Sequence, residues 1–155
     1  WRLGYMACNK EIAAACDKLQ GQFTSATCSI TQRAAIAALT GTMEPTQKML
    51  AEFRERRAAV LSLIKEIPGL KCSEPPGAFY IFPDVSSYFG KIKPGGETIA
   101  DADDLCMYLL HEAHVSTVSG KGFGEPACIR RSCANNLPNI EKGFAKIKKA
   151  LGALQ

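Results

Sequence analysis

The sequence lacks any long hydrophobic run, and no stretch approaches the ~18 consecutive apolar residues that a membrane-spanning helix requires. It also lacks an initiating Met and a signal peptide, because it opens on Trp1-Arg2-Leu3. These absences predict a piece of a longer protein that has no membrane partner. Of the 155 residues, 46% are hydrophobic and 22% are charged, which excludes disordered and low-complexity chains and is ordinary for a water-soluble domain.

Paired cysteine motifs are absent as well. The seven cysteines are an odd number and include no CxxC pair. Most of them lie among apolar or small residues, where a thiol behaves as a small hydrophobic group. The pattern predicts reduced cysteines in a cytoplasmic protein, with neither a disulfide framework nor a zinc site, and no other metal site is predicted.

A strong charge imbalance is also missing, since 19 Lys and Arg residues face 15 Asp and Glu residues for a net charge of +4. The only dense basic cluster is Lys142, Lys146, Lys148 and Lys149, at helical spacing near the C-terminus. A solvated helix face, with cations that favour the end of the helix dipole, explains this cluster better than a nucleic-acid partner does.

The periodicity of apolar residues predicts helices first and a small mixed sheet afterwards. Expected helices cover residues 9–23, 29–39, 45–67, 101–113 and 140–151, and expected strands cover residues 3–8, 70–74, 78–82, 115–118 and 127–134. The Ala-rich helix at 29–39 is expected to be buried. The predicted class is therefore α/β with an α+β small domain, divided into residues 1–42, a long connecting helix at 43–67, and residues 68–155.

Few side chains form a pattern that carries chemistry. The carboxylates of Asp101, Asp103 and Asp104 suit a helix N-terminus, so they are interpreted as caps. His111 and His114 suit a helix C-terminus better than a metal site. The glycine-rich stretch 120–124 matches neither GxGxxG nor a Walker loop and is interpreted as a turn. No nucleophile stands at a recognisable spacing from a base.

Two arginines stand beside or inside predicted strands. Arg2 precedes the apolar run at 3–8, and Arg130 lies within the run at 127–134. A guanidinium in a half-buried strand is costly unless it meets an anion, and its planar fork suits a carboxylate or a phosphate. Spacing alone favours an internal salt bridge for each of them.

Five short motifs occur in a fixed order along the chain. They are Trp1-Arg2-Leu3-Gly4-Tyr5, Met49-x-x-x-Phe53-x-x-Arg56-Arg57, Ile67-Pro68-Gly69, Pro75-Pro76-Gly77-Ala78-Phe79-Tyr80-Ile81-Phe82-Pro83, and Gly120 to Gly124 followed by Ile129-Arg130-Arg131-Ser132-Cys133-Ala134. In this order they resemble the class I pyridoxal-phosphate aminotransferases of fold type I, in particular the bacterial aspartate aminotransferase branch.

The resemblance implies that the chain is the C-terminal portion of such an enzyme: the end of the large cofactor-binding domain, the connecting helix and the small domain. It implies that Arg2 binds the phosphate of pyridoxal 5′-phosphate and that Arg130 binds the substrate α-carboxylate. The Schiff-base lysine of the family would lie upstream of residue 1, so this chain holds no catalytic residue and is expected to be inactive alone.

By the same resemblance, the intact enzyme is a homodimer that transfers an amino group between an amino acid, aspartate or glutamate, and a 2-oxo acid. One departure is Arg131, where the family usually has an apolar residue; it is expected either to reach solvent at a sheet edge or to pack differently. The alternatives are an alanine or aromatic aminotransferase, a carbon–sulfur lyase, and a non-enzymatic α+β binding module.

Overall fold

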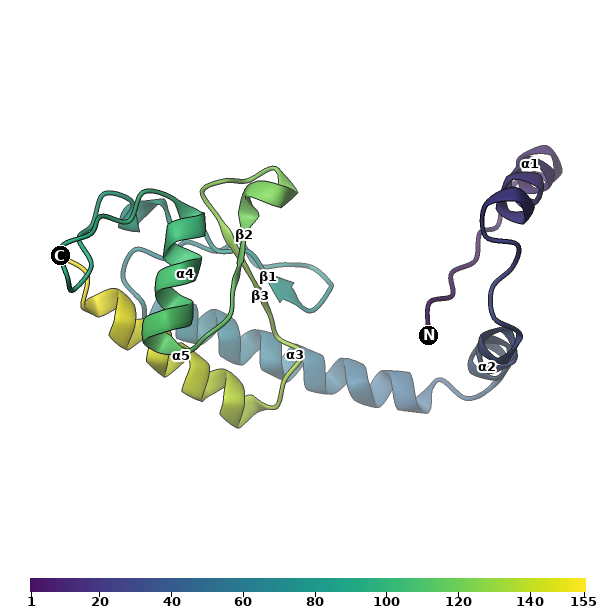
Figure 1. The fold of residues 1–155 in the computed structure, drawn as a ribbon. Coiled ribbons are helices and arrows are strands. Elements are labelled where there is room, and N and C mark those ends of the chain that lie inside the picture. Colours follow the sequence, from purple (N-terminus) through teal and green to yellow (C-terminus); the bar gives the residue numbers. More distant parts are fainter. The chain divides into compact units, whose positions relative to one another are not determined.

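The computed structural model describes all 155 residues, which form two compact units, Trp1–Lys48 and Met49–Gln155 (Figure 1). The elements are α1 (Lys10–Phe23), α2 (Ser29–Thr40), α3 (Glu44–Lys65), β1 (Tyr80–Ile81), η1 (Ser86–Tyr88), α4 (Ala102–Ala113), β2 (Val118–Ser119), η2 (Gly120–Phe123), β3 (Ile129–Ser132) and α5 (Leu137–Gly152). Helices and a small sheet confirm the predicted fold class. The first unit ends inside the first turns of α3.

The first unit consists of α1, α2 and the start of α3. The side chain of Asn9 caps α1 by accepting a hydrogen bond from the Ile12 amide at 2.9 Å, and Gly41 is the C-cap of α2. The expected burial of α2 is wrong, because Thr31 is its only buried residue. Residues 3–8 form no strand, since no second strand pairs with them there. The apolar stripe of α1 is exposed too, with Phe23 83% exposed.

The second unit holds the hydrophobic core. Its sheet has the order β1-β3-β2, and both pairs are antiparallel. Ile81 and Ile129 lie on the face of the sheet that packs against α4 and α5, where Leu105, Leu109 and Phe144 meet them. The expected stripe of α5 is confirmed, because Ile140, Phe144, Ile147 and Leu151 are all buried. No helix is long and apolar enough to cross a membrane.

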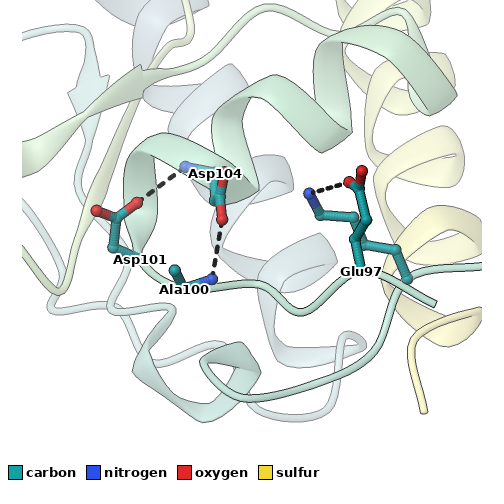
Figure 2. Close-up of polar contacts among 5 residues, drawn as sticks. Glu97, Ala100, Asp101 and Asp104 are labelled. Carbon is teal, nitrogen blue, oxygen red and sulfur yellow. Dashed lines mark hydrogen bonds and ion pairs between the residues drawn. The ribbon is translucent and has the colours of Figure 1, made fainter.

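Two of the three acidic residues cap the start of α4, as the sequence predicts, whereas Asp103 forms an ion pair with Lys121 at 3.6 Å. Asp101 accepts a hydrogen bond from the Asp104 amide at 2.9 Å, and the Asp104 carboxylate accepts one from the Ala100 amide at 3.0 Å (Figure 2). An ion pair between Lys93 and Glu97 lies in the loop just before, at 3.3 Å. The carboxylates of Asp101 and Asp104 therefore satisfy backbone donors at the start of α4, the helix that carries much of the core.

The environments of the cysteines differ enough to predict their order of alkylation. All seven thiols are free. Backbone N–H groups of Thr31 and Ile30 at the start of α2 lower the pKa of exposed Cys28, whereas burial raises the pKa of Cys133. The thiolate is the reactive form, so we expect iodoacetamide at neutral pH to modify Cys28 early and Cys133 last, as followed by peptide mass spectrometry. Equal rates at the two cysteines in the folded chain would contradict this assignment.

Candidate functional site

Arg130 lies in β3, the central strand of the sheet, and its guanidinium sits between two aromatic rings. The Tyr80 ring centroid is 4.5 Å from the guanidinium carbon, and the Phe123 ring centroid is 4.4 Å from it. Both rings offer the negative face of their π-system to the cation. Because Arg130 is only partly buried, the rings hold the fork in place while leaving it accessible.

The sheet register brings Tyr80 to Arg130. Tyr80 pairs with Ser132 across the β1–β3 ladder, and residues two apart on a strand share a face, so Tyr80, Ser132 and Arg130 lie on the same side. The Phe79 ring packs against Tyr80 with centroids 4.6 Å apart. Tyr80 belongs to one of the five sequence motifs, but no role was predicted for it; strand alternation was the signal that could have found it.

Phe123 reaches the guanidinium from the glycine-rich stretch. This stretch is a 3-10 helix, η2, that begins at buried Gly120. A side chain at Gly120 would meet the Cys128 carbonyl oxygen at 2.6 Å and the Phe82 ring at 2.9 Å. The Phe82 ring in turn contacts Phe123 edge-on, with centroids 6.3 Å apart. The missing Cβ therefore allows the tight packing that places Phe123.

A second arginine supports the segment that leads into β1. Arg57 of α3 donates a hydrogen bond to the Pro75 carbonyl at 2.8 Å and forms an ion pair with Glu74 at 3.2 Å. Ala78, which follows the turn, has a φ of 61°, an uncommon backbone conformation for a residue with a Cβ. Arg57 thus anchors the turn from which Tyr80 extends.

Neither Arg130 nor Arg2 has an acidic partner. The structure contains five ion pairs, and none of them includes either arginine. The internal salt bridge that spacing alone favoured is therefore absent at both positions. Arg130 presents a charged fork that nothing in its own unit neutralises, which suits an external anion.

Arg2 belongs to the first unit, where its side chain is exposed and its φ is 62°. Non-glycine residues with positive φ are uncommon and cluster at functional sites. The preceding carbonyl, that of Trp1, accepts a hydrogen bond from the buried Thr31 hydroxyl at 3.5 Å. Thr31 thus ties the start of the chain to α2.

Arg131 faces the other side of β3 and is not at a sheet edge. Its guanidinium carbon lies 4.1 Å from the centroid of the Phe144 ring of α5. Of the two expected possibilities, local repacking is therefore the one that the structure shows. The Nη1 atom is buried without a hydrogen-bond partner, and burial lowers the pKa of the side chain.

The two histidines lie at the C-terminal end of α4. His114 is the C-cap of α4 in a left-handed conformation with φ 52°, and His111 lies in the last turn of the helix. Nowhere do three or more His, Cys, Asp or Glu side chains gather as a metal would require. Their place at the C-terminus of α4 agrees with the interpretation from sequence.

The family model for aminotransferase class I and II matches residues 1–147. The chain belongs to this family. A curated relative from Petunia hybrida, a bifunctional aspartate aminotransferase and glutamate/aspartate-prephenate aminotransferase, is 47% identical over 154 residues. That match covers 97% of this chain and 32% of the relative. An aspartate aminotransferase of Pinus pinaster is 38% identical, again over 97% of this chain and 31% of the relative.

Solved structures agree with the family assignment. The aspartate aminotransferase of Rhizobium meliloti superposes with a TM-score of 0.87 at 34% identity, covering 94% of this chain and 36% of that one. An alanine aminotransferase of Pyrococcus furiosus superposes with a TM-score of 0.75 at 30% identity, covering 92% of this chain and 34% of that one. The chain thus spans about a third of the length of the relatives it matches, and the resemblance drawn from its five motifs is confirmed.

Proposed function

We propose that the intact protein is a pyridoxal-phosphate-dependent aminotransferase that exchanges an amino group between aspartate or glutamate and a 2-oxo acid. Within it, Arg130 binds the substrate α-carboxylate. The observation that carries this assignment is the Arg130 guanidinium, held between the rings of Tyr80 and Phe123 without an acidic partner. Aspartate is favoured over other donors because the relatives from Petunia hybrida and Pinus pinaster carry that name.

The work of Arg130 is to orient the amino acid. A guanidinium makes two parallel hydrogen bonds to a carboxylate, which fixes the plane of the bound molecule. Tyr80 and Phe123 limit rotation of the fork, so little further ordering is needed when substrate binds. Correct orientation of the reacting Cα–H bond is itself a large part of catalysis.

Arg2 is the residue of this chain that would bind the phosphate of the cofactor. Its exposed side chain has no ion-pair partner, and a guanidinium is a suitable donor set for a phosphate. When bound, pyridoxal phosphate supplies the electron sink for the reaction, while the protein supplies position and charge. The Schiff-base lysine is assigned upstream of residue 1, so the 155 residues alone are expected not to transaminate.

We further propose that the intact enzyme is a cytoplasmic homodimer. The dimer is carried over from the family resemblance. The cytoplasmic location rests on the cysteine pattern of the sequence, an odd number of cysteines with no CxxC pair.

The test is a substrate panel on the full-length protein supplied with pyridoxal phosphate. Aspartate, glutamate, alanine and phenylalanine are each offered with a 2-oxo acid, and a sulfur amino acid is offered without one. We expect amino-group transfer to be fastest from aspartate or glutamate, with the 155-residue chain as the inactive control. Preference for alanine or phenylalanine would support the other aminotransferases. Products formed from the sulfur amino acid in the absence of a 2-oxo acid would support a carbon–sulfur lyase. Binding of amino acids without any turnover would support a non-enzymatic binding module.

A further inference from the structure

The charge of Arg131, which is partly buried, is not used by the proposed function. The side chain points away from the face that carries Arg130, and it rests on the Phe144 ring. No ion pair includes it, and its Nη1 atom has no hydrogen-bond partner. Even a partly buried guanidinium loses hydration when it has no counter-charge, and an anion that binds beside it lowers that cost.

A cavity of about 320 Å³ opens beside this guanidinium, between β3 and the first half of α5. Besides Arg131 itself, its charged and hydrogen-bonding side chains include Lys142, Lys146, His114, Asn135 and Asn139. No Asp or Glu lines it. Neither lysine forms an ion pair elsewhere, so both ammonium groups are available to a ligand.

A glycine in α5 leaves space for the Arg131 guanidinium. Gly143 lines the same cavity, and a Cβ at this position would collide with the Arg131 Nη2 atom. The glycine occurs inside α5, where glycine disfavours the helix relative to alanine. Arg131 and Gly143 therefore form a matched pair: the missing side chain makes room for the charge at the cavity wall.

We propose that this cavity is an anion site for a phosphate group, taken up as inorganic phosphate or as a small phosphate monoester. A compact dianion matches a wall that carries one guanidinium and two ammonium groups with no acid. The asparagine amides add neutral donors for the remaining oxygens. A volume near 320 Å³ accommodates a small metabolite but not a large ligand.

The test is a titration of the 155-residue chain, followed by NMR of the Arg131 side chain and of the Gly143 and Asn139 amides. Inorganic phosphate and glycerol 3-phosphate are the two probes, each against chloride at matched ionic strength. We expect saturable shifts at these three positions. Tighter binding of one probe shows which of the two forms of phosphate the site prefers.

Three variants locate the site. Arg131→Gln removes a charge-assisted contact and is expected to weaken phosphate binding about tenfold. If Arg131→Gln does not fold, Lys142→Gln tests the site instead, because its side chain is exposed and lines the cavity. Its control is Lys149→Gln, which removes the same charge from the same helix but outside this cavity. Gly143→Ala displaces the guanidinium without changing any charge and is also expected to weaken binding, whereas Gly152→Ala, with open space around it, is not.

Shifts that grow linearly with phosphate, or that chloride reproduces, would overturn the proposal. So would equal losses in Lys142→Gln and Lys149→Gln, because these would indicate general charge attraction. Unchanged phosphate affinity in a folded Gly143→Ala variant would remove the role of the Arg131–Gly143 pair and with it the assigned site.

Discussion

In the full-length protein, Arg130→Lys is expected to lower kcat/KM for the amino-acid substrate about 10²–10³-fold, a cost of ~3–4 kcal/mol in the transition state. Lysine keeps the positive charge but loses the fork that fixes the carboxylate plane. It also loses the flat surface that stacks between Tyr80 and Phe123. Steady-state kinetics with aspartate and a 2-oxo acid measure the loss.

The matched control is Arg54→Lys, which makes the same exchange at an exposed position of α3 and should leave kcat/KM within a few-fold. Binding of pyridoxal phosphate should be nearly unchanged in Arg130→Lys, because Arg2 is the residue assigned to the phosphate. A mild effect of Arg130→Lys, or a loss of cofactor that accounts for the lost activity, would show that Arg130 does not bind the α-carboxylate.

Much of the helical structure could be predicted because its causes are local. The caps at Asn9 and Asp101 lie next to the donors they satisfy, and the α5 stripe repeats every three or four residues. Three of the five predicted strands occur, and they are short, since β1 has two residues and β3 has four. The predicted strands at 3–8 and 70–74 are wrong; at 70–74 there is only an isolated bridge between Lys71 and Asp84. A strand ends where its partner ends, and the partner is distant in sequence.

The candidate site was predicted only in part. Arg130 was selected as a candidate because a charge inside an apolar run is conspicuous in a sequence and because a family motif surrounds it. The stacking of Tyr80 and Phe123 on it was not found, since these residues lie about 50 and 7 positions before Arg130 and meet it only in the folded structure. The same limit applies to Arg131, whose fit depends on the missing side chain of Gly143.

The burial of α2 was predicted wrongly for a related reason. An apolar stripe or an Ala-rich face shows that a helix can pack, but it does not show what packs against it. Leu39 and Ile36 of α2 remain exposed, because nothing within residues 1–48 forms a second layer over them. Burial is a property of the partner surface as much as of the helix.

The second large effect concerns stability. Gly120→Ala is expected to lower the free energy of unfolding of the second unit by ~3 kcal/mol, because the new methyl group has no free volume. It would lie 2.6 Å from the Cys128 carbonyl oxygen and 2.9 Å from the Phe82 ring, and it would also collide with the Glu125 carbonyl oxygen. Two of these three neighbours are backbone atoms, which cannot rotate away as a flexible side chain can. Urea unfolding of the 155-residue chain, followed through amide NMR signals of α4, measures the change.

Gly122→Ala is the matched control, two residues along the same short helix. No atom lies within 4 Å of the Cβ that this substitution adds, and the Gly122 backbone is not in the left-handed region. We therefore expect a change within ~0.5 kcal/mol for Gly122→Ala. If the two variants unfold at the same urea concentration, η2 is not held by close packing at Gly120. The packing that places Phe123 on Arg130 would then need another explanation.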